Sequence, residues 1–184
     1  MGDEKERMLR SEWYRDEPDL AEDRRRCGRL LDRFNATEAD DHGERRRILE
    51  TLLGKFGPGA SVLPRFQCTY GSLISIGANS FVNYDAIFMD DAQITLGDDV
   101  RIGPRAQLLT ALHPMEDHER RRAGWERPVP ITIGDNAWLG GGVLVCPGVT
   151  IGENTVIGAG SVVLRDLPDH VFAAGNPARV IRQL

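Results

Sequence analysis

A six-residue period is the feature that most constrains how this chain can fold. One aliphatic side chain recurs at about every sixth position, and Gly or Asn usually follows it within two residues. A hexapeptide period is typical of a parallel β-helix. An interruption beginning near residue 108 splits the periodic part in two. The aliphatic positions are Ile76, Val82, Ala86 to Phe88, Ile94 and Val100 before the interruption, and Ile133, Leu139, Val145, Ile151, Ile157 and Val163 after it.

Each six-residue unit supplies one short strand and one tight corner. The aliphatic side chain points inward, and Gly, Asn or Asp takes the corner because these residues tolerate a positive φ. Three units make one triangular coil, and stacked coils bury a continuous aliphatic column. A strand with one aliphatic residue in six would suit a sandwich poorly, because alternation is expected there. We therefore predict a mainly β chain built as a parallel β-helix, with about three and a half coils after the interruption. The general rule for parallel crossovers predicts a right-handed coil.

Residues 1–58 differ from the rest of the chain in the spacing of their apolar residues, and this spacing indicates a helical module. Apolar residues such as Leu30, Leu31 and Phe34 follow a 3.6-residue spacing, with Glu and Arg between them. A helix start is expected at residues 35–37, with acidic residues in its first turn. Glycines at residues 54–59 end the helical part, so the β-helix is predicted over residues 59–184.

The two ends of a β-helix need cover, because an uncapped coil exposes unpaired backbone groups. The helical module is the natural cover for one end. The C-terminal tail, residues 166–184, is predicted to return as a strand along the outside or over the other end.

Charge and composition narrow the functional classes. The net charge of −5 argues against broad nucleic-acid binding, which needs a basic face. No apolar run is long enough to span a membrane, and the charged start MGDEKERMLR lacks the apolar core of a secretion signal. Cys27, Cys68 and Cys146 show no CxxC pairing, so neither a disulfide framework nor a thiolate zinc site is indicated. We expect a cytoplasmic protein with reduced thiols that does not insert into a membrane.

Most cations are arginines, and they cluster among acidic residues at 24–26, 45–47 and 120–122. Mixed charge of this kind is typical of solvated, salt-bridged surfaces. We interpret the three clusters as surface rather than as ligand sites. The acidic balance still permits a local basic pocket for an anionic ligand.

The interruption, LLTALHPMEDHER, carries a histidine, His113, directly before a proline. We predict that residues 111–130 leave the wall of the β-helix as a loop. Without context, a lone histidine before proline is usually a solvated turn residue. Histidine changes charge near neutral pH, however, and this property suits a general base.

Longer stretches of the chain resemble a known family. The run PITIGDNAWLGGGVLVCPGVTIGENTVIGAGSVVLRDLPDHVFAAGNPARVIR, the loop start LTALHP and the helical stretch FNATEADDHGERRRILETLLGKFG are similar to the maltose and galactoside O-acetyltransferases, which are hexapeptide-repeat acyltransferases. The resemblance covers residues 8–182. Hexapeptides alone are shared by several activities, but their combination with the helical module, the His-Pro loop and the AGNPARVI tail is specific.

The resemblance implies a left-handed parallel β-helix that forms a homotrimer with active sites between neighbouring subunits. It implies transfer of an acetyl group from acetyl-CoA to a sugar hydroxyl, with no metal. His113 falls on the position of the family's catalytic histidine. The implied substrate-binding residues are Asp16, placed in an N-terminal helix, with Thr69, Phe81, Asp91 and Glu126. The implied cofactor-binding residues are Asn83, Gly141, Ala159, Leu164, Arg165, Arg179 and Arg182.

Three of these positions depart from the family. Relatives can carry tyrosine at the position of Phe81, and they often have serine at Gly141 and threonine at Leu164. Side-chain contacts of the family's kind are therefore missing at these positions, whereas backbone contacts can persist.

The implied chemistry is a direct attack. Histidine removes the proton of the acceptor hydroxyl as its oxygen attacks the thioester carbonyl, and such assistance supplies about 10²- to 10⁴-fold. No acyl-enzyme is needed, and the imidazolium can return its proton to the departing CoA thiolate. Backbone N–H groups near residues 140–142 are candidates for the oxyanion. Glu126 or another carboxylate is a candidate for orienting the imidazole.

Three alternatives remain open. A carbonic-anhydrase-like metal enzyme shares this fold, and His113 and His118 mimic two of its three ligands, but residues 60–112 contain no histidine. A non-catalytic scaffold would be indifferent to the loss of His113. Within the enzyme class, serine or an antibiotic could replace the sugar as acceptor.

Overall fold

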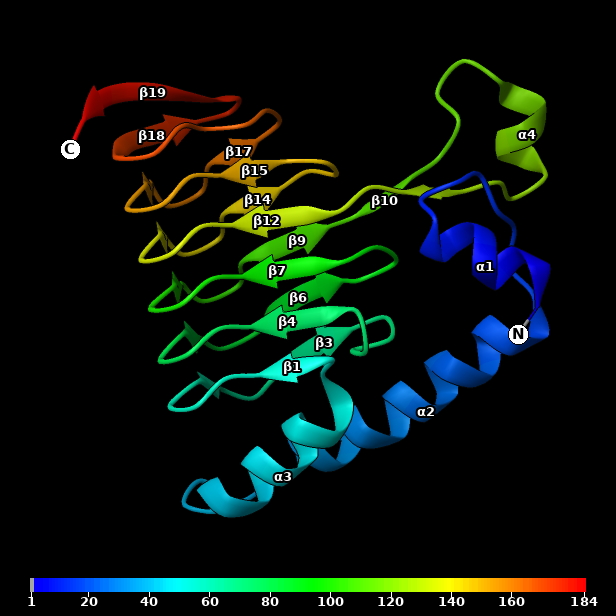
Figure 1. The fold of residues 1–184 in the computed structure, drawn as a ribbon, viewed down its shortest axis with the longest axis horizontal. Helices are drawn as coiled ribbons and strands as arrows, with labels where there is room; N and C mark the ends of the chain where they lie inside the picture. Colours follow the sequence, from blue (N-terminus) through cyan, green and yellow to red (C-terminus); the bar gives the residue numbers. More distant parts are fainter. Residues whose placement is uncertain (1) are drawn as a thin grey trace.

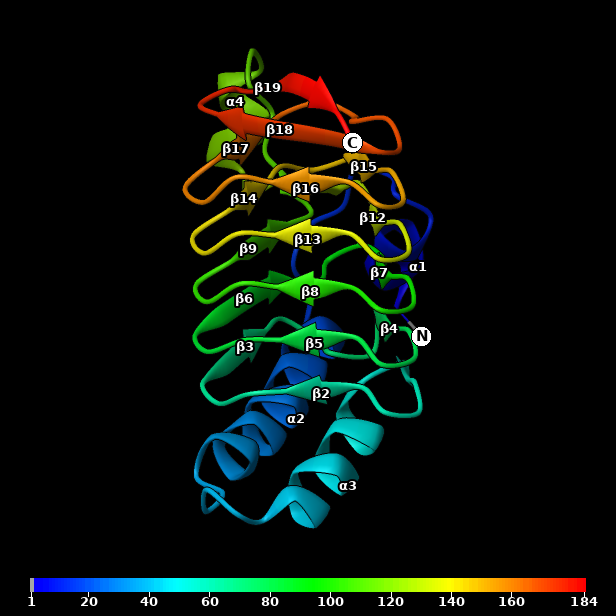
Figure 2. The same cartoon turned by 90° about the vertical axis from the view of Figure 1, so that its left-hand side faces the viewer.

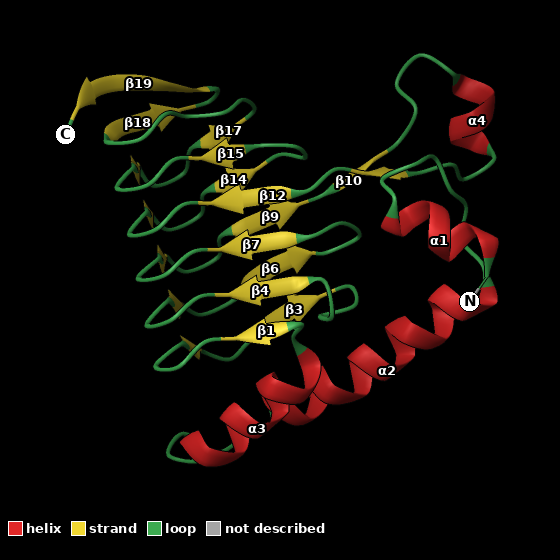
Figure 3. Cartoon of the chain, viewed as in Figure 1, coloured by secondary structure: helices red, strands yellow, loops and turns green. Residues whose placement is uncertain are grey.

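The computed structural model of the chain describes residues 2–184. Three sheets of very short strands form the walls of a triangular prism (Figures 1 and 3). The first wall contains β1 (Lys55–Phe56), β4 (Ile74–Ile76), β7 (Ile94–Leu96), β12 (Ile131–Ile133) and β15 (Thr150–Ile151). The second wall contains β2 (Ser61–Val62), β5 (Phe81–Val82), β8 (Arg101–Ile102), β13 (Trp138–Leu139), β16 (Val156–Ile157), β18 (Val171–Gly175) and β19 (Ala178–Gln183). The third wall contains β3 (Phe66–Cys68), β6 (Ala86–Met89), β9 (Gln107–Leu109), β14 (Leu144–Val145) and β17 (Val162–Val163).

The prism is a parallel β-helix, as the period predicts, and its hand is left. In Figure 2, β5, β8 and β13 cross the foreground from right to left while the chain climbs. The right-handed expectation is therefore wrong, and the hand implied by the family resemblance is confirmed. The general rule concerns twisted strands joined by long crossovers. Here strands of two to four residues are joined by tight corners, so that reasoning does not apply.

The number of coils after the interruption was overestimated. The six strands from β12 to β17 make two coils, because each coil needs one strand from each wall. Strands β1 to β9 make three coils before the interruption. The prism begins at β1, a few residues before the predicted start at residue 59.

The predicted inward positions form the core. All of the periodic aliphatic residues outside the loosely phased unit at residues 86–88 are at most 1% exposed, and within that unit Phe88 is fully buried. Register keeps like positions in line, as when Val82, Ile102, Leu139 and Ile157 stack in the second wall. Burying one aliphatic side chain of this size stabilises the fold by about 1.5–3 kcal/mol, so the column is the main source of stability.

The corners follow the predicted chemistry only in part. Asn79, Asp99, Asn136 and Asn154 adopt φ values of 54–58° in one column of corners, as expected for residues that tolerate this region. The glycine two residues earlier in each unit has another role. A Cβ at Gly134, for example, would lie 2.6 Å from the backbone nitrogen of Glu153 in the next coil. These glycines are needed because neighbouring coils approach closely, not because of a positive φ.

The N-terminal helices are α1 (Asp3–Leu9), α2 (Pro18–Asn35) and α3 (His42–Leu52). The helix start expected at residues 35–37 is wrong, because Asn35 ends α2. Helix α3 begins later, where the Asp41 side chain accepts a hydrogen bond from the Glu44 N–H at 3.0 Å. Asn35 resembles a cap in sequence, but its side-chain amide bonds the backbone N–H and C=O of Phe66, each at 2.9 Å. It therefore ties α2 to the third wall.

Both ends of the prism are covered as predicted. Helices α2 and α3 lie beneath the first coil (Figure 1), and Leu31, Phe34, Leu49 and Leu52 share one core with it. At the other end, β19 pairs antiparallel with β18 and closes the second wall. No helix among residues 2–184 is long and apolar enough to cross a membrane.

Two of the three scattered cysteines meet in the fold. Cys27 of α2 and Cys68 of β3 are free thiols whose sulfur atoms lie 3.6 Å apart. The hydrogen bond with Cys27 and burial both raise the pKa of the Cys68 thiol, so the Cys68 thiol is held in its protonated, weakly nucleophilic form.

Candidate active site

The interrupted stretch leaves the prism between β9 and β12 (Figure 1). Its two arms are β10 (Ala111–Leu112) and β11 (Arg127–Pro128), which pair antiparallel. Between them lies the short helix α4 (His118–Arg122), which has no buried residue. Residues 111–130 are called the loop below.

His113 stands at the end of β10, one residue beyond the pair Leu112 and Arg127. Its side chain is 54% exposed, so a ligand can reach it. The Nδ1 atom lies 3.2 Å from the carbonyl oxygen of Trp125. Because a carbonyl oxygen only accepts, Nδ1 must carry the proton in this contact, and Nε2 keeps a free lone pair. The backbone of the loop thus assigns the tautomer that a base needs.

His113 opens onto a hollow of about 250 Å³. Five of the residues implied by the family resemblance meet there, although they come from four separate segments of the chain. These are Asp16, Thr69, Asp91, His113 and Glu126. The other lining residues are Tyr14, Arg24, Met89 and Ala111. The hollow is therefore rich in carboxylates and contains one histidine.

The carboxylates of Asp91 and Glu126 both lie near the hydroxyl of Tyr14. The Tyr14 hydroxyl donates to Glu126 Oε2 at 2.8 Å and lies 3.4 Å from Asp91 Oδ1. Asp91 is 5% exposed, and burial, followed by the charge of Glu126, raises its pKa. Thr69 Oγ1 lies 3.5 Å from the other oxygen of Asp91. The acceptor oxygens on this wall suit a ligand that offers several hydroxyl donors.

Glu126 does not orient the imidazole in the way that was considered from the sequence. Its Oε1 atom lies 4.0 Å from Nε2, which is beyond hydrogen-bond distance, and the Trp125 carbonyl already holds Nδ1. Glu126 instead lines the same hollow as His113, on the side of Nε2.

Asp90, which precedes Asp91, supports the lining of the hollow from its buried side. Asp90 is fully buried and accepts hydrogen bonds from the backbone N–H groups of Thr69, Tyr70 and Leu73 at 2.8–3.3 Å. Burial raises the pKa of Asp90 to about 7, against the effect of these three donors. Asp90 thereby fixes the turn that presents Thr69 to the hollow.

Asp16 lies between α1 and α2 and not within a helix as expected. Arg24 of α2 donates to Asp16 Oδ2 at 2.7 Å and to the Tyr70 hydroxyl at 3.0 Å. Arg24 is salt-bridged as expected for residues 24–26, but it also lines the hollow, whereas Arg25 pairs with Glu22 on the exterior. Sequence reasoning also missed Tyr14, whose only signal was its place two residues before Asp16.

The remaining predicted residues lie outside this hollow. Asn83, Gly141 and Ala159 occupy the corners between the second and third walls, where Asn83 N–H bonds the Ile102 carbonyl of the next coil at 3.0 Å. Arg179 of β19 lies at the same edge of the second wall, because it pairs with Ala174 of β18. Leu164 and Arg165 follow β17 at the opposite edge of the third wall, Phe81 faces outward on β5, and Arg182 lies on β19.

Two of the expected oxyanion donors are already in use. The N–H of Gly140 bonds the Ile157 carbonyl and that of Gly142 bonds the Pro104 carbonyl, each at 2.8 Å. Across residues 2–184 no backbone acceptor pairs with the N–H of Gly141. Of the three glycines, Gly141 is the one with a free donor.

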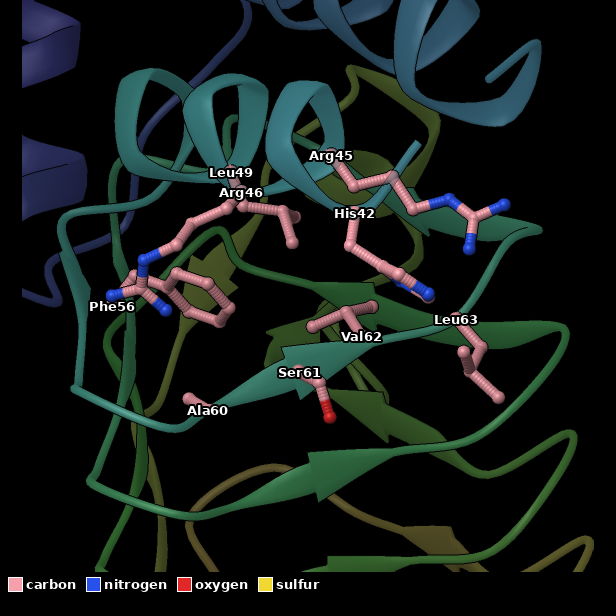
Figure 4. Close-up of a pocket in the computed structure, with 9 residues that line it drawn as sticks. All are labelled: His42, Arg45, Arg46, Leu49, Phe56, Ala60, Ser61, Val62 and Leu63. Carbon is pink, nitrogen blue, oxygen red and sulfur yellow. The ribbon is translucent and has the colours of Figure 1, made fainter. Parts of the chain in front are cut away.

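A second hollow, of about 210 Å³, lies between α3 and β2 (Figure 4). Leu49, Phe56 and Val62 form part of its lining, and the Arg46 guanidinium stacks over the Phe56 ring at 5.0 Å. It contains none of the predicted site residues. In the part of the chain that the structure describes, no group of three or more His, Cys, Asp or Glu side chains is arranged to hold a metal ion. The hollow at His113 is therefore the candidate active site.

A left-handed prism of six-residue units is the fold of the hexapeptide-repeat proteins, and the family models place this chain among the transferases that share it. Two family models match the chain. The "Maltose acetyltransferase hexapeptide capping motif" matches residues 7–57, and "Bacterial transferase hexapeptide (six repeats)" matches residues 130–165.

Individual relatives narrow the class. The galactoside O-acetyltransferase of Escherichia coli K12 is 42% identical over 165 residues, which are 90% of this chain and 81% of that protein. The crystal structure of a maltose O-acetyltransferase from Clostridium difficile 630 shares 44% identity with a TM-score of 0.96, covering 98% of this chain and 97% of that one. A hexapeptide-repeat acetyltransferase from Vibrio cholerae, complexed with acetyl-CoA, shares 38% identity with a TM-score of 0.92, covering 100% and 99%. The chain belongs to the maltose and galactoside O-acetyltransferase family.

Proposed function

We propose that the protein transfers an acetyl group from acetyl-CoA to a hydroxyl of a sugar, with His113 as the general base. The observation that carries this proposal is the contact between Nδ1 and the Trp125 carbonyl, which in the neutral imidazole directs the lone pair of Nε2 to a hollow lined by carboxylates. A base with a free lone pair beside hydroxyl-binding groups is what activation of an alcohol requires.

The reaction runs through one tetrahedral intermediate. The acceptor hydroxyl gives its proton to Nε2 as its oxygen bonds the thioester carbon, and the carbonyl becomes an oxyanion. Collapse of this intermediate breaks the C–S bond, and the imidazolium returns the proton to the CoA thiolate. Asp91 and Glu126 accept hydrogen bonds from neighbouring hydroxyls of the acceptor, which fixes the reacting hydroxyl near the base.

The cofactor is proposed to lie between two subunits of a homotrimer. Asn83, Gly141 and Ala159 line a corner of the prism at the far edge of the third wall from the loop, so a neighbouring copy is needed to bring such a corner to His113. The free N–H of Gly141 is the proposed oxyanion donor. The side chains of Arg179 and Arg182 bond only neighbouring backbone carbonyls among the described residues, and together with Arg165 they are available for the phosphates of CoA.

The test is the substitution His113→Ala. We expect kcat to fall about 10²- to 10⁴-fold, with an unchanged thermal midpoint because the side chain is exposed. His118→Ala is the matched control, since His118 is an exposed histidine on the same loop that does not line the hollow. Normal acetyl transfer by His113→Ala would end the base assignment.

The acceptor is tested by a screen that follows thiol release from acetyl-CoA. Glucosyl, galactosyl and maltosyl compounds are compared with serine and with hydroxyl-bearing antibiotics. We expect turnover with at least one of the sugars. Turnover with serine or an antibiotic alone would replace the sugar by that acceptor while leaving the acetyltransferase assignment in place.

A further inference from the structure

Two arginines and two tryptophans form a stack beside the loop. The Arg120 guanidinium lies over the rings of both Trp13, at 5.0 Å, and Trp125, at 4.6 Å. Arg15 lies over the Trp125 ring at 5.3 Å. Each distance is within the range of a cation–π interaction. Trp13 and Arg15 belong to the segment between α1 and α2, whereas Arg120 and Trp125 belong to the loop, so the stack joins two parts far apart in sequence.

Backbone hydrogen bonds join the same two segments. Tyr14 and Glu126 exchange two of them, at 2.9 and 3.0 Å. The Arg127 side chain also donates to the Ser11 carbonyl at 3.1 Å. The N-terminal segment is thus clipped to the loop at the two residues that follow Trp125.

The other contacts of α4 lie within the loop itself: the Asp117 cap and the hydrogen bonds from the Arg121 side chain to the Pro114 and Met115 carbonyls. Helix α4 has five residues and buries none of them, and an isolated helix of that length is not stable in water. The Arg120 guanidinium has no carboxylate within 4.0 Å among residues 2–184. Its charge is therefore directed at the two rings.

One member of the stack, Trp125, also contacts the proposed base, His113. Trp125 is stacked between Arg15 and Arg120, and its carbonyl oxygen is the acceptor for Nδ1 of His113. The Trp125 backbone is also tied to Arg120, whose carbonyl oxygen accepts the Trp125 N–H at 3.1 Å, so a displacement of Arg120 shifts the backbone that carries this carbonyl. Without the carbonyl, nothing at the 3.2 Å contact would keep the proton on Nδ1.

We propose that Trp13 and Arg120 are positioning residues, whose stack with Trp125 holds the Trp125 carbonyl against His113 and so sets the tautomer and direction of the base. The N-terminal module then has two roles, because it covers the end of the prism and also aligns the catalytic loop. This inference rests on the proposed role of His113.

The first test compares kinetic constants. Trp13→Ala and Arg120→Ala are expected to lower kcat about 10- to 100-fold, the scale of a displaced catalytic group. KM for acetyl-CoA is expected to stay within about twofold, since neither residue lies at the proposed cofactor corner. Arg122→Ala is the matched control, as an exposed arginine on the same helix, and is expected to keep the parent kcat. Trp13→Phe and Arg120→Lys preserve a ring and a cation and are expected to recover most of the loss.

The second test needs no catalysis. Nitrogen-15 NMR of the imidazoles in the resting protein, with the His113 signals assigned through His113→Ala, reports the tautomer directly. The parent protein is expected to show the Nδ1–H form, and Trp13→Ala a mixture of both tautomers. Because α4 lies outside the core, Arg120→Ala keeps the prism folded and gives the same readout if Trp13→Ala loses structure.

The outcomes are separable. Unchanged kcat and an unchanged tautomer in Trp13→Ala and Arg120→Ala would overturn the positioning role. Full activity of His113→Ala would instead remove the proposed base, while the NMR result would still decide whether the stack holds the imidazole. A loss of kcat equal in Arg122→Ala would also contradict the inference, because it would show a general effect of loop charge.

Discussion

The walls of the prism and the loop are specified in different ways. A wall residue such as Leu139 lies between Ile102 and Ile157 in a repeated register. The six-residue period of the sequence therefore predicts its environment. His113 has no repeat around it, and its orientation comes from Trp125 and from an N-terminal segment about one hundred residues earlier. Stability thus resides in the periodic part, and the proposed chemistry lies where the period stops, on a segment that depends on distant contacts.

The largest expected effect lies in the wall. Leu139→Ala removes buried methyl groups from the central column and is expected to lower the free energy of unfolding by about 2–5 kcal/mol. Met115→Ala, at a position 82% exposed on the loop, is the counterpart and is expected to change it by less than about 0.5 kcal/mol. Denaturant unfolding measures both. Similar values for the two variants would break the contrast between wall and loop.

The next effect concerns the turn where the wall meets the hollow. Burial raises the pKa of Asp90 to about 7, so the folded state binds a proton that the unfolded state releases near pH 4. The free energy of unfolding is therefore expected to fall as pH rises from about 4 to 7, with a slope of at most about 1.4 kcal/mol per pH unit from this group.

Asp90→Asn should flatten that part of the profile, because the amide does not titrate while its oxygen can still accept from Thr69 and Tyr70. Thermal or denaturant unfolding across this pH range gives the difference between variant and parent. A parallel pair of curves would show that Asp90 titrates normally and that its three donors outweigh its burial.

The side-chain hydrogen bond between Tyr14 and Glu126 should have an intermediate effect on stability. Tyr14→Phe removes the hydroxyl that donates to Glu126, and hydrogen bonds to charged groups contribute about 1.5–3 kcal/mol. We expect a destabilisation within this range, together with a higher KM for the acceptor because Glu126 is no longer fixed. Unfolding curves and acceptor titrations test the two effects, and an unchanged KM would place Glu126 outside the acceptor site.

The smallest expected effect is a stabilisation in the helical cover. Gly28 lies inside α2, and a Cβ there would meet no atom within 4 Å. Gly28→Ala is expected to raise the free energy of unfolding by about 0.5–1 kcal/mol. No change, or a loss, in the thermal midpoint would show that α2 does not unfold together with the prism.

The comparison also explains what could be predicted from the sequence. The inward residues of the prism, the exit of the loop and the covers at both ends follow from the period and from the need to pair backbone groups. The corner asparagines were also predictable, whereas the reason for the glycines before them was not, since it depends on the distance between coils.

The residues that meet at the hollow were named through family resemblance and not through physics alone. Asp16, Thr69, Asp91 and Glu126 join His113 only after the chain has folded. Arg24 was hidden in a charged cluster, and Asn35 was misinterpreted because its partner, Phe66, lies 31 residues away. The carbonyl that fixes the base belongs to the backbone of Trp125, and a backbone atom leaves no signal in residue types.

The most direct test of the whole account is a crystal structure with CoA and an acceptor sugar bound. The account predicts a sugar hydroxyl within about 3.2 Å of His113 Nε2, with the thiol of CoA on the other side of that oxygen and Gly141 of a neighbouring copy beside it. A complex in which the sugar or the thiol lies away from His113, with Nε2 facing only solvent, would contradict it.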